Sequence, residues 1–161
     1  MQLTQIAKVV QCIAPIDGNG GIVQAARVNM AKYEHVTFIC GIGNLAADII
    51  LTMYSAATSL AAGTVMNFNY RRSTTPGALV SVVDTTPMVN TAALTISNAT
   101  EDNDCIVIEV DAADLPAPLT RQYVGVDFSN AGAASLISVV AICMWPRYAA
   151  EPNLMPDPTA A

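Results

Sequence analysis

The sequence predicts an all-β protein, specifically an antiparallel β-sandwich, jelly-roll-like, with about ten short strands. Three observations predict this fold. Apolar residues make up 53% of the 161 residues and charged residues only 12%, against roughly 25% charged in an ordinary soluble domain. The apolar residues lie in short runs rich in Val, Ile and Thr. Gly, Asn, Asp and Pro separate these runs at a spacing of about 8–12 residues, which is typical of sandwiches and barrels.

The first half of the chain contains five candidate strands separated by turn residues. The glycine-rich stretch Pro15–Gly21 predicts a loop, Asn29–Glu34 a short polar connection, and Gly43 with Asn44 a break. The strands themselves alternate between apolar and polar positions, so that one face of each is expected to be buried. They cover Ile6–Ile13, Ile22–Val28, His35–Ile42, Asp48–Ala57 and Thr64–Arg72.

The second half continues the same pattern. Its acidic stretch Ala99–Asp104 predicts a loop, and helix is expected only as a turn or two, near Asn44–Asp48 or Asp111–Leu115. The central apolar segment Cys105–Val110 is the clearest strand of this half. The strand candidates are Leu79–Val83, Ala92–Ser97, Cys105–Val110, Tyr123–Phe128 and Ser135–Met144.

We expect one β-sandwich domain over residues 1–148 and a proline-rich C-terminal arm over 149–161. Prolines 152, 156 and 158 favour extended backbone in this arm and exclude a helix. Leu154 and Met155 are apolar residues that a purely solvated tail would not need. The arm is therefore expected to pack on a neighbouring subunit or on another protein, with a solvated tail as the alternative.

Charge and hydropathy exclude several classes of partner. The formal net charge is −6 with seven basic residues, whereas a nucleic-acid-binding protein needs clustered Lys and Arg. The same shortage argues against binding to an anionic membrane surface. The uncharged stretches Ile49–Tyr70 and Phe128–Pro146 are too rich in small polar residues to predict a membrane span. The N-terminal residues lack the basic region of a signal peptide.

The sequence predicts no catalytic site, no cofactor and no metal, so we do not expect an enzyme. His35 is the single histidine, and nothing around it marks a nucleophile. Cys12, Cys40, Cys105 and Cys143 lie in apolar runs without a CxxC pair, which favours buried free thiols.

Two acidic groups leave alternatives open. The loop containing Glu101, Asp102 and Asp104 offers oxygen ligands for a cation, but a solvated loop tip is favoured because the spacing of a calcium loop is absent. Glu109 and Asp111 flank Val110 on one strand face and resemble a catalytic carboxylate pair, although an exposed strand end is favoured.

The candidate partner interface consists of basic and aromatic residues near strand ends. The adjacent Arg71 and Arg72 either protect a sheet edge or form ion pairs with an acidic partner. Trp, Tyr and Arg are enriched at binding hot spots, and Trp145, Arg147 and Tyr148 follow the last predicted strand. Together with the arm residues, the candidate interface comprises Arg71, Arg72, Trp145, Arg147, Tyr148, Leu154 and Met155.

Three segments resemble small structural proteins encoded among the head genes of tailed bacteriophages. In those proteins a Tyr-x-His sequence leads into an apolar strand, an Ile-Glu-Val-Asp strand follows midway, and Arg-Tyr-Ala closes the domain before a proline-rich end. The corresponding residues here are Tyr33, His35, Ile108, Glu109, Val110, Asp111, Arg147, Tyr148 and Ala149.

The resemblance implies a virion structural protein, a decoration or cement protein that stabilises the head at capsomer junctions. Its implied partners are the major capsid protein and further copies of itself, most plausibly as a trimer. It would be made in the host cytoplasm and reside on the capsid exterior. Two alternatives stay open: a carbohydrate- or host-surface-binding β-sandwich module, and a tail or neck structural component.

Overall fold

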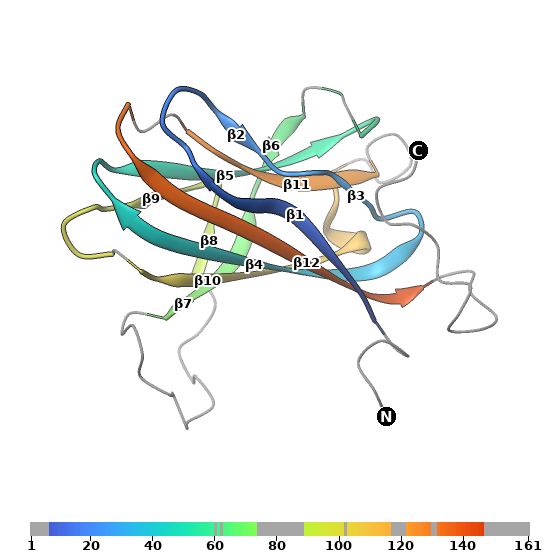
Figure 1. Ribbon diagram of the computed structural model, residues 1–161. Helices are drawn as coiled ribbons and strands as arrows, with labels where there is room; N and C mark the ends of the chain where they lie inside the picture. Colours follow the sequence, from blue (N-terminus) through green and yellow to red (C-terminus); the bar gives the residue numbers. More distant parts are fainter. Residues whose placement is uncertain are drawn as a thin grey trace.

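The computed structural model describes residues 7–59, 61, 63–73, 89–101, 103–116, 122–129 and 132–146. They form two antiparallel six-stranded sheets that pack face to face (Figure 1). The predicted antiparallel β-sandwich is confirmed, and within these residues helix is limited to one 3-10 turn, η2 (Ala112–Asp114). Twelve strands lie in the described residues, against about ten predicted.

Sheet 1 contains the longest strands of the molecule. Its strand order is β1-β12-β4-β10-β7-β8. The strands are β1 (Ala7–Asp17), β12 (Ser135–Pro146), β4 (Tyr33–Leu45), β10 (Cys105–Asp111), β7 (Phe68–Ser73) and β8 (Val89–Thr91).

Sheet 2 is built around β11, whose side chains are buried on both faces. Its main order is β2-β11-β5-β6, with β3 paired to β11 and β9 paired to β5. The strands are β2 (Val23–Gln24), β3 (Val28–Asn29), β11 (Tyr123–Phe128), β5 (Ile49–Ala56), β6 (Thr64–Met66) and β9 (Ala93–Ile96).

The core lies between the sheets and follows the two-residue period of the strands. In β5, Ile49, Leu51 and Met53 share one face and are fully buried. Sheet 1 contributes the alternate residues of its central strands. Burial of this apolar surface is the main favourable term for folding, at about 25 cal/mol per Å².

Two predicted breaks in sheet 1 are wrong. Strand β4 continues through Gly43 and Asn44, because glycine there lets β12 approach closely; a Cβ on Gly43 would lie 2.8 Å from the Cβ of Leu136. Strand β1 continues to Asp17 through the predicted loop residue Pro15. It is an edge strand whose register shifts between Ile13 and Ile16, and proline is tolerated at such positions.

Two predicted strands, Thr64–Arg72 and Ile22–Val28, are each divided between two elements. Thr64–Arg72 forms β6 in sheet 2 and β7 in sheet 1, with the change of sheet at Asn67. The predicted strand Ala92–Ser97 contains β9 of sheet 2 undivided, and the preceding β8 belongs to sheet 1. Ile22–Val28 yields the short β2 and β3, which both pair with β11. The predicted strand Leu79–Val83 lies outside the described residues.

A buried ion pair fastens β2 and β3 to sheet 2. Arg27 lies between these strands and binds Asp127 of β11 with two contacts of 2.8 Å, Nη1 to Oδ1 and Nη2 to Oδ2. Its guanidinium also lies 5.6 Å from the ring centroid of Tyr54. Gly125 makes room for the arginine, because a Cβ there would lie 2.8 Å from Arg27 Cδ. The ion pair therefore joins the connection between β2 and β3 to β11 and lies against Tyr54 of β5.

All four cysteines are free, and three are buried. Burial raises the pKa of Cys12 to about 11 and that of Cys143 to about 12. The pKa of Cys40 is raised further by complete burial, and that of half-buried Cys105 is also raised, mainly by burial. Protonated, inaccessible thiols are poor nucleophiles, so the three buried cysteines, Cys12, Cys40 and Cys143, act as small apolar core residues.

We predict that Arg27→Met lowers the free energy of unfolding by about 3–5 kcal/mol, because it leaves the Asp127 carboxylate buried without a counter-charge. The double variant Arg27→Met, Asp127→Leu should recover most of that loss. Urea unfolding followed by circular dichroism measures both values. If the double variant is as unstable as the single one, the packing of the arginine side chain, rather than charge pairing, is the stabilising factor.

We predict that a thiol reagent at pH 8 modifies at most Cys105 in the native protein and all four cysteines after denaturation. Stability should fall as the pH rises above about 9, because the unfolded chain loses thiol protons that the native chain retains. Cys105→Ser is the matched variant and should remove the fast phase of modification. Rapid reaction of any thiol in native Cys105→Ser would contradict the buried placement of the other three cysteines.

Candidate interaction surface

The outer face of sheet 1 carries an apolar surface that the sandwich does not cover. Along β12, the inward residues Ile137, Val139, Ala141 and Cys143 are buried in the core. The side chains that alternate with them point outward and are also mostly apolar. They are Leu136, Ser138, Val140, Ile142 and Met144.

Neighbouring strands extend this surface through their register. Val140 of β12 pairs with Ile39 of β4, which pairs with Val107 of β10. On the other side, Val9 of the edge strand β1 pairs with Ile142. Paired residues of antiparallel strands point to the same face, so these side chains are contiguous. We call this set the β12 face: Val9, Ile39, Val107, Leu136, Val140, Ile142, Met144 and Trp145.

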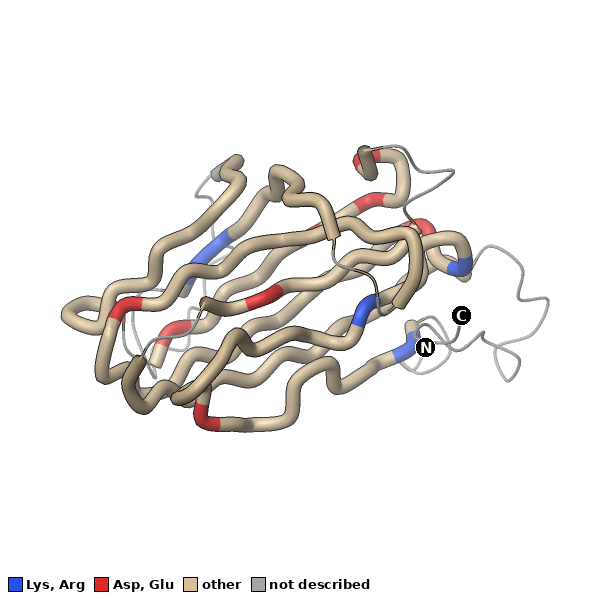
Figure 2. The backbone as a smooth tube through the Cα atoms, turned by 90° about the horizontal axis from the view of Figure 1, so that it is seen from above, with Lys and Arg blue, Asp and Glu red and all other residues tan. Residues whose placement is uncertain are grey.

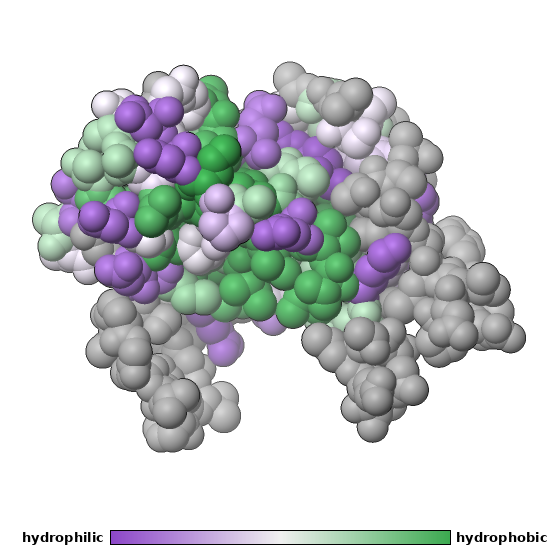
Figure 3. Space-filling model, in the orientation of Figure 1, coloured by the Kyte–Doolittle hydropathy of each residue, from purple (hydrophilic) through white to green (hydrophobic). Residues whose placement is uncertain are grey.

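Several of these side chains are open to solvent. Val9 is 49% exposed, Leu136 53% and Trp145 58%. Figure 3 shows apolar side chains gathered over β12 and β4, interrupted by a few polar ones. Single exposed apolar residues need no explanation, but a contiguous patch on a soluble protein marks a surface that something else covers.

Charged residues are sparse across the molecule, and Figure 2 shows them scattered along the backbone, apart from the adjacent Arg71 and Arg72. On the outer side of sheet 1 they lie toward β10 and β7, apart from Asp17 of β1, which pairs in register with Leu136. Glu109 pairs in register with Asn69, and Val107 pairs with Arg71. This side of the face is therefore polar, whereas the side formed by β1, β12 and β4 is apolar.

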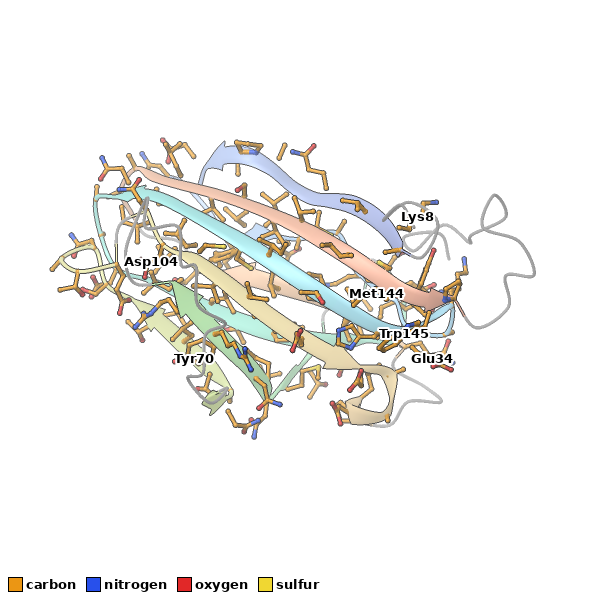
Figure 4. All side chains as sticks on the ribbon, turned by 90° about the horizontal axis from the view of Figure 1, so that it is seen from below. Lys8, Glu34, Tyr70, Asp104, Met144 and Trp145 are labelled. Carbon is orange, nitrogen blue, oxygen red and sulfur yellow. The ribbon has the colours of Figure 1, made fainter. Side chains whose placement is uncertain are left out.

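An aromatic cluster stands at one end of the β12 face. The rings of Trp145 and His35 are 5.4 Å apart, and His35 Nδ1 lies 2.6 Å from Asp111 Oδ1. His35 Nε2 also lies 3.2 Å from the hydroxyl of Thr37. Figure 4 shows Trp145 beside Met144 and Glu34 at this end, and Asp104 at the opposite end. His35 thus lies between the Asp111 carboxylate and the Thr37 hydroxyl, and its ring contacts Trp145.

The backbone at Trp145 is unusual. Its φ angle is +52°, a left-handed conformation that bulky residues rarely adopt. Such outliers persist where the surroundings hold them and they concentrate at functional positions. The exposed, supported Trp145 is consequently the strongest single candidate among the predicted interface residues.

The two predicted arginines have different environments. Arg71 is exposed on the outer side of β7. Arg72 instead points toward the acidic loop of its own chain, where its guanidinium pairs with Glu101 and its Nε lies 3.7 Å from Asp104 Oδ2. Ion pairing of Arg72 with an acidic partner is therefore replaced, in this structure, by ion pairing within the molecule.

The same contacts show which positive group faces the carboxylates of the acidic loop. Asp104 is 4% exposed, and its burial raises the pKa of its carboxyl, while Arg72 acts in the opposite direction. The positive charge at this loop is thus an arginine. Asp102 lies outside the described residues, and within the described part of the chain no three His, Cys, Asp or Glu side chains are grouped closely enough to hold a metal.

The remaining predicted interface residues, Arg147, Tyr148, Leu154 and Met155, lie outside the described residues, as does the arm 149–161. What sequence reasoning missed is the β12 face itself, apart from Trp145. A signal existed: Phe128–Pro146 is uncharged throughout, and a strand that is apolar at successive positions is typical of burial on both faces.

Comparisons with known proteins provide no family: no protein-family model matches the chain, and no curated protein shows significant similarity to it. Within the part of the chain that the structure describes, no helix is both long and apolar enough to cross a membrane. The surface is therefore interpreted from its own geometry.

We predict that Arg72→Met destabilises the protein by about 1–3 kcal/mol at pH 7, because Asp104 and Glu101 lose their counter-charge. The loss should shrink at pH 4. Without the arginine the pKa of Asp104 rises further, so the variant regains stability as the pH falls and the carboxyl is protonated.

Arg71→Met is the matched control and should change stability by no more than about 0.5 kcal/mol, as exposed substitutions usually do. Thermal unfolding at the two pH values measures all three proteins. An Arg72→Met loss that does not change with pH would show that the arginine stabilises the loop by packing alone.

Proposed function

We propose that this protein is a structural component of a tailed-bacteriophage head, a decoration protein that binds the assembled capsid shell and stabilises it. The single observation that carries the proposal is the β12 face, an apolar sheet surface with a supported, exposed Trp145. A protein with such a face functions as part of a larger assembly, because the face gains free energy when a second copy or a different protein covers it.

Further features support this role. Low charge and long strands suit a protein that functions in a packed lattice, where interface area supplies the stability. Repetition of one modest contact over many equivalent sites multiplies its effect. The resemblance of Tyr33, His35, the Ile108–Asp111 strand and the Arg147–Ala149 sequence to phage head proteins agrees with this proposal.

A second candidate function is binding of a carbohydrate on a host surface. One observation favours it: the exposed Trp145 ring lies beside His35, and the Asp111 side chain next to His35 is 57% exposed. Sugars stack on such rings and hydrogen-bond to neighbouring polar groups. Against this candidate, no second exposed aromatic ring accompanies Trp145 in the ring contacts of the described residues.

We predict that the protein co-purifies with heads. Particles of the phage that encodes it are disrupted, heads and tails are separated on a density gradient, and the protein is detected by immunoblotting. Gold-labelled antibody on intact heads then tests whether the protein lies on the exterior. Loss of the protein should lower the temperature at which heads rupture.

Other outcomes separate the alternatives. Protein found only on detached tails or necks would replace the decoration role with the tail alternative. Protein absent from purified particles would overturn the proposal. Titration with host-surface glycans, followed by the fluorescence of Trp145, would then test the carbohydrate alternative.

A further inference from the structure

The β12 face needs an occupant, and its own properties indicate which one. We infer that this face packs against the same face of a second copy of the chain, forming a two-fold symmetric dimer. Two sheet faces made of aliphatic side chains can interdigitate, as the inner faces of a sandwich do at a separation of about 10 Å.

The area of the face matches what a stable pair requires. Four strands, β1, β12, β4 and β10, form it side by side. The outward residues of β12 run from Leu136 to Trp145. With a rise of about 3.3 Å per residue and about 4.8 Å between strands, this gives on the order of 600–700 Å². A standard interface buries roughly 800 Å² on each partner.

The charge on the face also fits a second copy. The chain carries a formal net charge of −6, so two copies repel unless they meet through a surface that is not itself strongly negative. From Leu136 to Met144, every residue of β12 is uncharged. The acids at the polar side have bases nearby: Asp111 contacts His35, and Arg71 pairs in register with Val107, two residues from Glu109.

The free edge of sheet 1 is less suited to association. Edge-to-edge pairing requires a regular strand with free backbone groups. The edge strand β1 contains Pro15, which has no N–H to donate, and its register shifts twice along its length. These features obstruct a continuous intermolecular sheet, so the contact is expected between faces.

Symmetry gives the pairing a definite form. A two-fold axis through Val140, perpendicular to the strands, sets each β12 antiparallel to its copy. Residues at equal distances on either side of Val140 then face each other across the axis, so Met144 and Trp145 of one copy approach Leu136 of the other. Such a pair is a dimer, which distinguishes it from the trimer implied by the resemblance to phage head proteins.

The test uses the full-length protein and sedimentation velocity over a wide concentration range. We expect a dimer, and we expect Leu136→Lys to raise the dissociation constant at least tenfold. The matched control is Val65→Lys on sheet 2. Val65 is 47% exposed and Leu136 53%, so both changes place a lysine at a similarly open apolar position.

A second measurement reports on the face directly. Trp145 is the only tryptophan of the chain, so intrinsic fluorescence observes one end of the face. Its emission should shift to shorter wavelength as the concentration rises through dimer formation. Leu136→Lys should abolish this shift, while its far-ultraviolet circular dichroism spectrum stays that of the unchanged fold.

Several results would overturn the inference. They are a monomer at every concentration, a trimer, or a dimer weakened by Val65→Lys but not by Leu136→Lys. If residues 147–161 occupy the face instead, the full chain will be monomeric and removal of those residues will produce the dimer. Pairing of the pure protein does not require a capsid. The sedimentation experiment therefore tests the dimer alone, and the head co-purification tests the decoration role alone.

Discussion

Strand β12 is apolar on both faces, and a two-layer sandwich can bury only one of them. The inward side chains of β12 meet sheet 2 and form part of the core. The outward side chains have no layer of this chain above them among the described residues. A strand with this pattern normally lies in the middle of three layers. The need to cover the outer face is therefore a consequence of the sequence of β12 itself. The proposed contacts with other protein surfaces follow from this need.

The few charges of the chain are placed where they protect the fold. Arg27 and Asp127 lie one hundred residues apart in sequence and neutralise each other in a buried position. Arg72 neutralises Glu101 and Asp104 where the acidic loop packs on the end of β4, through the hydrogen bond from Ile42 N to Asp104 O. With these charges paired inside the molecule, β12 carries no charge from Leu136 to Met144. Because the chain has few charged residues and several of them pair internally, few remain for the outer face of sheet 1, which is mostly apolar.

The period of two residues made most strands predictable from the sequence, because inward side chains must alternate with outward ones. It could not show that Thr64–Arg72 changes sheets. Met66 and Phe68 both point into the core, although they belong to different sheets, and the alternation passes through Asn67 without interruption. Gly43 was misread for a different reason: a glycine that admits a neighbouring strand has the same local signature as a glycine that ends one.

The candidate surface was predictable only in part. Trp145 stood out by residue type, but the contribution of His35 depends on register between β4 and β12, which no local pattern contains. Arg72 was predicted as a contact residue, and only the folded chain shows the acidic loop opposite it. The aliphatic residues of the β12 face were overlooked because, in a sequence, an outward valine looks the same as a buried one.

The outer faces of the two sheets differ in composition, so the two sides of the sandwich are not equivalent as binding surfaces. The outer side of sheet 2 contains polar contacts that are satisfied within the chain: Arg27 binds Asp127, and Asn29 Nδ2 donates to the hydroxyl of Tyr123 at 3.0 Å. Sheet 1 presents aliphatic side chains that gain free energy only by being covered. Under the proposed pairing, the two apolar faces meet at the centre of the dimer and both sheet 2 faces point outward. A capsid surface would then meet the outer face of sheet 2, where these internal polar contacts lie beside the exposed apolar residues Ile50 and Val65.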